Sequence, residues 1–326
     1  MHDKPPADQT NLEQLFYPVA YRRRKKAETN NIRFAYYTSA ATALDIINND
    51  EVWLRNARLM NDYSEINHGQ NCLHAVWMEK TIQARLVLLC EKFGSDVKEK
   101  IEQSFDEEQG VRANETFILC ISEHNSSEID EDTYGRLSMW RAYGGDTSVA
   151  FVFNSAPFFC EAQELKALLV PVEYGDVAQF GKLFDEFLEG LEGNAEMLQE
   201  KFRADEFIDA ICQSLLIATL SFKHPAFAEE REWRIVYQPI KDSSDYIEKE
   251  IRAVEGIPQL IYKIKLRNIP EIGFEGATLP EMLNKLIIGP TTEPYPIWAS
   301  FKQLLHDKGV ENAGKKVSVS GIPLRK

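Results

Sequence analysis

The chain has 326 residues, of which 44% are hydrophobic, 11% aromatic and 27% charged, and this is the composition of an ordinary soluble globular protein. Its formal net charge of −14 repels polyanions, which argues against extended binding to nucleic acid or to an anionic membrane. Five scattered cysteines, no signal peptide and no apolar run of about 18 residues lead us to expect a cytoplasmic location.

The first 32 residues are predicted to form a flexible basic arm. They are rich in proline and polar residues, and five consecutive cations run from Arg22 to Lys26. Such a run is most often a solvated tether, and a phosphate-binding arm is the functional alternative. Residues 33–326 are predicted to form a single α+β domain with a helical insertion at about residues 176–220.

A strand, a capped helix and a second strand are predicted next. These elements span residues 33–38, 40–49 and 51–56. Thr38 and Ser39 carry the hydroxyl groups that cap a helix N-terminus. A strand end beside a helix N-terminus offers free backbone NH groups to an anion. Tyr36, Tyr37 and Thr38 are therefore candidate ligand-binding residues.

The middle of the chain combines helices, two buried strands and an aromatic pair. A turn at Asn61 and Asp62 precedes the helices. After the polar loop EHNSSEIDEDTYGRL, a short helix presents Trp140 and Tyr143 on one face, since they lie three residues apart. This pair is either core packing or a stacking surface for a ring-bearing ligand. The predicted elements span residues 67–92, 95–108, 116–122, 137–143 and 149–153.

A charged strand is predicted from Glu230 to Tyr237. Side chains alternate between the two faces of a strand, so Glu230, Glu232 and Arg234 share one face. Arg234 is close enough to neutralise Glu232, which leaves Glu230 free for a partner. A solvent-facing ladder of salt bridges is the alternative interpretation. Lys223 lies shortly upstream as a further candidate.

The last part of the chain completes an α+β pattern. Strands are predicted at residues 259–266, 285–288 and 316–320, and a helix at 294–306. We expect a twisted, mainly antiparallel sheet, either continuous or split in two, with helices packed outside it. The motifs GxGxxG, GxxxxGKS/T, HExxH and GxSxG are absent, which argues against Rossmann dehydrogenases, P-loop enzymes, zinc proteases and α/β-hydrolases.

Four stretches between about residue 33 and residue 290 together resemble a bacterial family called domain of unknown function 2971. That family shows an aromatic first strand, an asparagine and aspartate turn, a tryptophan and tyrosine helix, and a closing strand with the pattern E.E.R. Tyr63 stands where the family often has proline. The residues that carry the resemblance are Asn61, Asp62, Trp140, Tyr143, Glu230, Glu232 and Arg234.

A more distant resemblance is to ADP-ribosyltransferases, which begin with a similar strand and capped helix and end with a glutamate on or beside a late strand. The resemblance implies NAD as the substrate, with Glu230 or Glu232 as the catalytic acid and Tyr37 beside the ribose. A carboxylate beside the sugar would stabilise the positive charge that develops when nicotinamide leaves. The cofactor-binding residues it implies, together with the neighbouring candidates, are Tyr36, Thr38, Arg58, Asn61, Asp62, Trp140, Tyr143, Lys223 and Arg234.

The leading functional expectation is an ADP-ribosyltransferase or NAD glycohydrolase that acts in phage defence or as a toxin. Its substrate would be a nucleotide-type small molecule, and no metal or membrane is expected to take part. One alternative is a non-enzymatic sensor module that binds a nucleotide or a protein. Another is a metal-dependent phosphodiesterase built on Asp62, Glu65, Glu230 and Glu232, although these acids lack a recognisable metal-ligand spacing.

Overall fold

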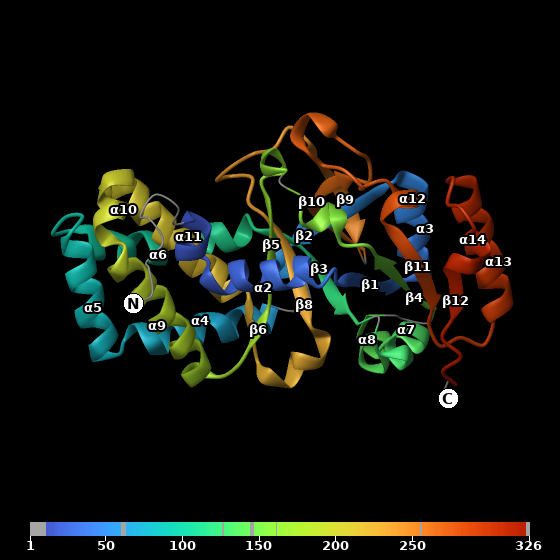
Figure 1. The fold of residues 1–326 in the computed structure, drawn as a ribbon, viewed down its shortest axis with the longest axis horizontal. Helices are drawn as coiled ribbons and strands as arrows, with labels where there is room; N and C mark the ends of the chain where they lie inside the picture. Colours follow the sequence, from blue (N-terminus) through green and yellow to red (C-terminus); the bar gives the residue numbers. More distant parts are fainter. Residues whose placement is uncertain are drawn as a thin grey trace, which may run out of the picture. The chain divides into compact units, whose positions relative to one another are not determined.

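The computed structural model describes residues 11–59, 63–125, 127–143, 147–160, 162–254 and 256–323 (Figure 1). Helices make up 53% and strands 24% of the structure, and the sheet is mostly antiparallel and open, which confirms the expected α+β class. None of the described helices combines the length and the apolar character that a membrane span requires.

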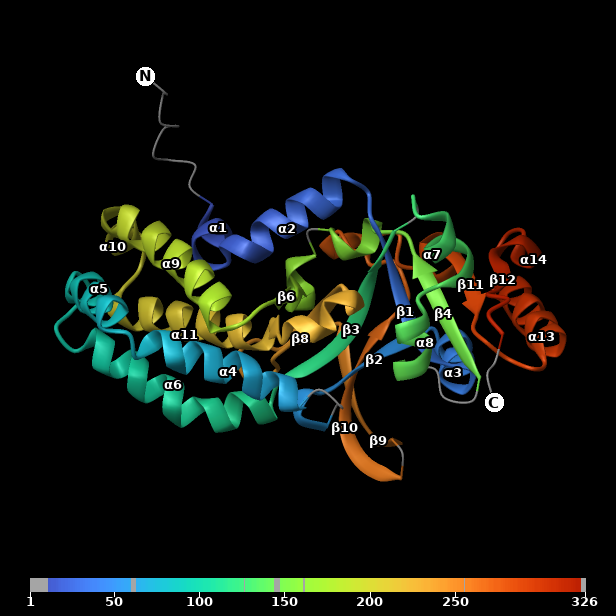
Figure 2. The same ribbon diagram turned by 90° about the horizontal axis from the view of Figure 1, so that it is seen from below.

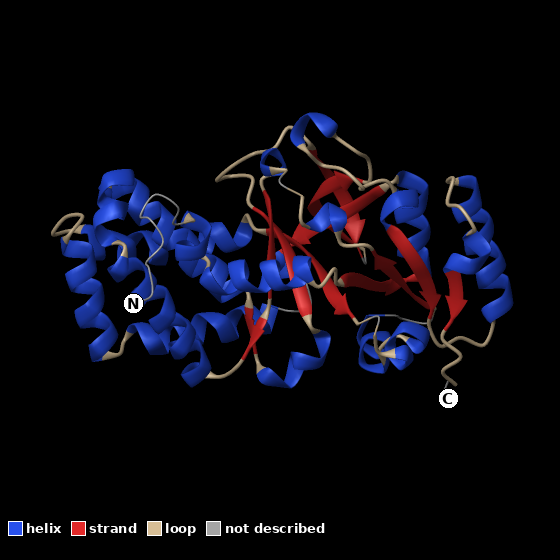
Figure 3. Ribbon diagram, in the orientation of Figure 1, coloured by secondary structure: helices blue, strands red, loops and turns tan. Residues whose placement is uncertain are grey.

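The chain divides into two compact units, whereas the sequence indicated a single domain. The helical unit comprises Met1–Lys26, Ala57–Asn114 and Val170–Ala228, and the sheet unit comprises Ala27–Asn56, Glu115–Leu169 and Glu229–Lys326. The main sheet belongs to the second unit, whereas the first is built almost entirely from helices (Figure 3). The chain enters each unit more than once, so neither corresponds to one continuous segment.

The helical unit buries an apolar core along its long helices. In α9 the buried residues Phe180, Phe184, Phe187 and Leu191 recur at helical spacing, which gives this helix one apolar face. α4 packs on α9, and α6 packs on α11. The unit contains α1 (Leu12–Phe16), α2 (Pro18–Thr29), α4 (Tyr63–Trp77), α5 (Lys80–Glu91), α6 (Val97–Asn114), α9 (Val177–Gly193), α10 (Ala195–Lys201), α11 (Ala204–Leu220) and the paired strands β6 (Glu173–Tyr174) and β7 (Phe222–Lys223).

The expected basic arm is helical in its described part, which corrects the prediction of a flexible segment. Residues 1–10 lie outside the described residues. Pro18 begins α2, a position where its fixed backbone angle suits a helix. Three of the consecutive arginines form ion pairs with Glu186, Glu173 and Glu13. The cation run is therefore placed against carboxylates of its own unit.

The sheet unit is organised around β3 (Phe117–His124). The strand order is β12-β11-β4-β1-β3-β2-β10-β9, and the pairs along this path are antiparallel except β11 with β12. The other strands are β1 (Arg33–Ser39), β2 (Glu51–Asn56), β4 (Ser148–Phe153), β5 (Ala167–Pro171), β8 (Glu232–Tyr237), β9 (Ile247–Val254), β10 (Ile257–Lys265), β11 (Leu283–Ile288) and β12 (Val317–Val319).

The sheet forks at β3. One edge of β3 pairs with β8 over residues 117–122. On the other edge, residues 122–124 pair with β1 and residues 117–118 pair with β2. β1 and β2 therefore share one edge of β3 but leave it near opposite ends (Figure 2). The described strands β1–β5 and β8–β12 nevertheless belong to one ten-stranded sheet, so the alternative of a sheet split in two is wrong.

Short helices cover the sheet of this unit. Ser39 caps α3 as expected, because its hydroxyl accepts a hydrogen bond of 3.1 Å from the backbone NH of Thr42. α8 packs against β1 and buries Trp140 with Tyr37, Ala150 and Val152. The helices are α3 (Ala40–Asn49), α7 (Ile129–Tyr134), α8 (Leu137–Tyr143), α12 (Leu279–Met282), α13 (Pro294–Asp307) and α14 (Ala313–Lys316).

Candidate functional site

Tyr37 and Trp140 are in direct contact within the sheet unit. Their ring centroids are 4.7 Å apart at an interplanar angle of 71°, an edge-to-face arrangement. The indole NH of Trp140 donates a hydrogen bond of 2.8 Å to the Tyr134 carbonyl. Gly135 turns the chain between α7 and α8 at φ +68, and a Cβ atom there would lie 2.6 Å from the Trp140 ring. The turn therefore needs glycine at this position.

Tyr143 and Glu230 form the second pair of the site. The Tyr143 hydroxyl donates a hydrogen bond of 3.1 Å to Oε1 of Glu230. Glu230 is half-buried and ends the 3-10 segment Pro225–Glu230, which precedes β8. It therefore lies outside the strand, which corrects the predicted strand boundary by two residues. We call Tyr37, Trp140, Tyr143 and Glu230 the candidate site.

Arg136 joins the two halves of the candidate site. Its backbone NH donates a hydrogen bond of 3.0 Å to the Tyr37 hydroxyl. Its buried guanidinium donates to the carbonyl of Glu229, the neighbour of Glu230, and to the carbonyl of Glu123 at 3.2 Å. Arg136 thus connects Tyr37 and the turn at Glu229 to the end of β3.

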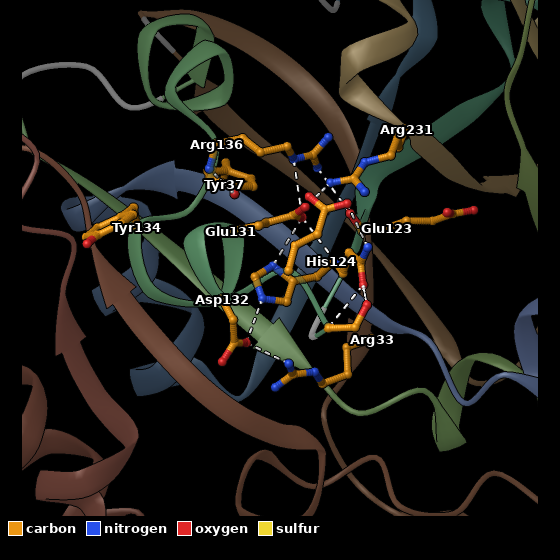
Figure 4. A network of polar contacts seen from close by, with 12 residues as sticks. Arg33, Tyr37, Glu123, His124, Glu131, Asp132, Tyr134, Arg136 and Arg231 are labelled. Atoms are coloured by element: carbon orange, nitrogen blue, oxygen red, sulfur yellow. Dashed lines mark hydrogen bonds and ion pairs between the residues drawn. The ribbon is translucent and has the colours of Figure 1, made fainter.

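Glu131 is the buried acid beneath this arrangement, and it is only 5% exposed. Its carboxylate forms an ion pair with Arg231 and lies 3.6 Å from Nε of Arg136. Arg231 has a left-handed backbone with φ +45, which costs free energy in a residue other than glycine and is held here by the contacts of the turn. Glu131 therefore stabilises the turn that carries Glu230 (Figure 4).

A histidine and an aspartate continue the network. Nδ1 of His124 lies 3.6 Å from Glu131, and Nε2 lies 3.1 Å from Asp132. Asp132 also forms ion pairs with Arg33 at 2.6 Å and Lys285 at 2.5 Å. We call this whole network the polar cluster, and its members are Arg33, His124, Glu131, Asp132, Arg136, Arg231 and Lys285.

Burial and charge shift two pKa values of the polar cluster. Desolvation lowers the pKa of His124, because burial disfavours the imidazolium. Burial alone would raise the pKa of Asp132, but hydrogen bonds from Lys285 and His124, together with the Arg33 charge, outweigh it and lower that pKa to about 2. At neutral pH the cluster therefore contains a neutral imidazole beside an ionised aspartate.

We expect the stability of the protein to fall in two steps on acidification. The unfolded chain binds a proton at His124 below pH 6.5, whereas the folded chain resists it, so stability is lost as the pH falls through this value. Asp132 contributes a second loss between pH 3.8 and about 2. Urea unfolding across a pH series measures both. His124→Gln should remove the first step, the same change at the exposed His306 should not, and a first step that survives His124→Gln would contradict this assignment.

Glu232 and Arg234 form a buried ion pair on β8. Their exposed fractions are 4% and 1%, and Nε of Arg234 lies 2.7 Å from Oε1 of Glu232. The expected neutralisation of Glu232 by Arg234 is confirmed. Because both side chains are buried, the interpretation as a solvent-facing ladder of salt bridges is wrong. Of the two acids Glu230 and Glu232, Glu230 is the more accessible.

The remaining predicted residues do not join the candidate site. Tyr36 and Thr38 alternate with Tyr37 along β1, so they lie on the other face of the strand. Thr38 is buried and Tyr36 is half-buried. Desolvation raises the pKa of the Tyr36 hydroxyl. The side chains of Tyr36, Tyr37 and Thr38 therefore do not share one face, and anion binding by the backbone at this strand end stays a prediction.

Two further candidates belong to the other unit, and two are not described. Arg58 and Lys223 belong to the helical unit, where the fully buried Lys223 places its ammonium 5.2 Å from the Phe227 ring centroid. Asn61 and Asp62 lie outside the described residues. Among the residues that the structure does describe, no group of three or more His, Cys, Asp and Glu side chains is arranged to hold a metal ion.

The polar cluster was not predicted from the sequence, because its central segment was expected to be a polar loop. Two signals for the short helix α7 were present there. Asp130, Glu131 and Asp132 occupy the first turn, where carboxylates favour a helix N-terminus, and Gly135 follows the last helical residue. Arg231, which pairs with Glu131, lies 100 residues further along the chain, and no local pattern indicates it.

The three comparisons with known proteins give a single match. The search of curated proteins and the search of solved structures each found no match. The resemblance to ADP-ribosyltransferases therefore stays a prediction. Residues 139–235, which include Trp140, Tyr143 and Glu230, match the model of a family described as protein of unknown function (DUF2971), and this match supports the resemblance stated from the sequence.

Proposed function

We propose that the protein cleaves the bond between nicotinamide and ribose in NAD, either as an ADP-ribosyltransferase or as an NAD glycohydrolase. The observation that carries this proposal is the meeting of Tyr37, Trp140, Tyr143 and Glu230 from three separate segments of the sheet unit. The half-buried Tyr143 ring beside the half-buried Glu230 carboxylate suits a ligand with a planar ring and a developing positive charge, while the buried Tyr37 and Trp140 rings support Tyr143 from the core.

Glu230 would be the catalytic acid of this reaction. As the C1′–N bond of the ribose breaks, nicotinamide leaves with the bonding electron pair, and water or an acceptor then attacks C1′. A carboxylate at the ribose stabilises the cationic sugar more than the ground state. Tyr143 orients that carboxylate through its hydrogen bond. Glu232 is less suited to the role, because it is buried and neutralised by Arg234.

Glu230→Gln tests the proposal. The full chain should release nicotinamide from NAD, and the variant should release it at least about 100-fold more slowly, which corresponds to roughly 3 kcal/mol of transition-state stabilisation. Chromatographic measurement of nicotinamide gives both rates. The matched control is Glu229→Gln, because the side chain of Glu229 is exposed and only its backbone carbonyl contacts Arg136. Equal rates for the wild type and Glu230→Gln, or no release at all, would refute the proposal.

A second candidate is a module that binds a nucleotide without converting it. The polar atoms of Tyr37 and Trp140 are engaged by the protein itself and their rings pack in the core, which leaves Tyr143 as the half-buried ring of the site. This function predicts that a nucleotide raises the melting temperature of the protein while nicotinamide release stays at the background rate. A thermal-shift series with product analysis separates it from the enzyme.

A further inference from the structure

A cavity of about 90 Å³ lies within the helical unit and is partly open to solvent. None of the predicted site residues lines it. Its walls come from three separate parts of the chain: residues 16–20, residues 170–187 and residues 214–222. A cavity needs only about 10–15 Å³ of such space to hold one water molecule, so this one has room for a small organic group.

The walls of the cavity are mainly apolar, and a third of the lining residues are aromatic. Phe180 contacts Phe222 edge to face at 5.0 Å and stacks on Phe184 at 6.4 Å, and Phe184 contacts Phe187 at 5.9 Å. These mutual contacts hold the rings in place. An engineered apolar cavity of about 150 Å³ in another protein stays dry and binds benzene and xenon, and the walls of this partly open cavity are likewise mostly apolar. An apolar group is therefore the occupant that this space favours.

Small side chains leave the room between the aromatic rings. Ala20 on α2 and Ala218 on α11 both line the cavity, as do Ser214 and Ser221. A larger side chain at either alanine would occupy the space from inside the protein. The cavity is thus a consequence of particular small residues, and single substitutions can close it.

The polar atoms around the cavity carry no uncompensated charge. The Tyr17 and Ser214 side chains hydrogen-bond to each other, and burial raises the pKa of Tyr17 to about 12, so its hydroxyl is neutral. Ser221 donates to the Ile217 carbonyl at 2.7 Å. Glu173 forms an ion pair with Arg23 at 2.8 Å. A charged ligand would find no partner here and would lose its hydration.

The first turn of α2 closes one side of the cavity. Pro18, Val19 and Ala20 line it. The two residues that follow Tyr21 are held by ion pairs, Arg22 with Glu186 on α9 and Arg23 with Glu173 on β6. These two ion pairs hold the first turn of α2 against its own unit. The run of cations, for which a phosphate-binding arm was the functional alternative, thus helps to hold one wall of the cavity in place.

We propose that this cavity binds a small uncharged molecule through an apolar part of about the size of a benzene ring. The proposal does not depend on the function of the candidate site. The probe is toluene, added to the full chain in a thermal-shift titration. The melting temperature should rise by about 3 °C when toluene reaches roughly ten times its dissociation constant. Benzoate, which has a similar ring and a negative charge, should produce no rise.

Two filling variants locate the effect. Ala218→Leu and Ala20→Leu should each abolish the rise with toluene, and either one suffices if the other does not fold. Ala178→Leu is the matched control, since Ala178 is exposed on α9 and does not line the cavity, and it should keep the rise. No rise in the wild type, or a rise that persists in the filling variants, would overturn the site. An equal rise with benzoate would overturn the uncharged class of ligand.

Discussion

Arg234→Met should lower the free energy of unfolding by about 3–5 kcal/mol. Arg234 is 1% exposed and lies 2.7 Å from the Glu232 carboxylate, which is 4% exposed. The substitution keeps much of the side-chain volume but removes the positive charge, so the carboxylate stays buried without its guanidinium partner. Breaking a buried ion pair from one side is costly for this reason. Urea unfolding monitored by tryptophan fluorescence gives the change.

The double variant Arg234→Met with Glu232→Gln separates charge from packing. Removing both charges should restore a large part of the lost stability, because no isolated charge then remains in the interior. The exposed pair of Arg203 and Asp205 provides a control, and Arg203→Met should leave the free energy of unfolding unchanged. A double variant as unstable as Arg234→Met alone would show that the cost comes from packing.

Glu131→Gln should destabilise the protein by about 3 kcal/mol and slow the proposed reaction at least tenfold. The change keeps the size of the side chain but removes the charge that faces Arg136 and Arg231. Arg231 then loses its ion pair while its backbone stays in the left-handed region. The turn that presents Glu230 should relax, and kcat should fall more than KM rises.

Asp130→Asn is the matched control for this variant. Asp130 lies on the same short helix and is exposed, so its charge is screened by water and both stability and kcat should stay unchanged. Unfolding experiments and steady-state kinetics on the two variants provide the comparison. A Glu131→Gln protein that loses stability while its kcat stays at the wild-type value would limit Glu131 to a structural role.

The elements with strong local signals were predictable from the sequence. The strand β1, the Ser39 cap and the helix α3 follow from a short run rich in aromatic residues and a hydroxyl at the N-cap position. α13 matches its predicted range to within one residue, since its apolar residues recur at helical spacing. The pairing of Glu232 with Arg234 followed from the period of two along a strand. Each of these signals acts over only a few residues.

Features that depend on distant contacts were not predictable. The basic run looked like a tether because its carboxylate partners Glu173 and Glu186 lie more than 100 residues away. The predicted helix over residues 67–92 is two helices, with a break between Trp77 and Lys80. The edge strand β9 was missed, since its exposed charged residues hide the strand pattern.

The candidate site shows the same limit. Sequence reasoning selected Tyr37, Trp140, Tyr143 and Glu230, and the structure brings them together. It did not find Arg136, whose contacts join these residues. A single arginine beside a glycine forms no recognisable sequence motif. Its structural role depends on the segments that carry Tyr37 and Glu229, which contact it only in the folded chain.

The forked pairing of β3 gives this strand a mechanical role. Its first residues carry the half-sheet of β2, β10 and β9, and its last residues carry the half-sheet of β1 and β4. Close-packed interiors transmit strain, so a change of twist in either half is felt by the same eight residues. His124 ends that strand, so one backbone of eight residues supports both the polar cluster and the part of the sheet that continues to the hairpin of β9 and β10.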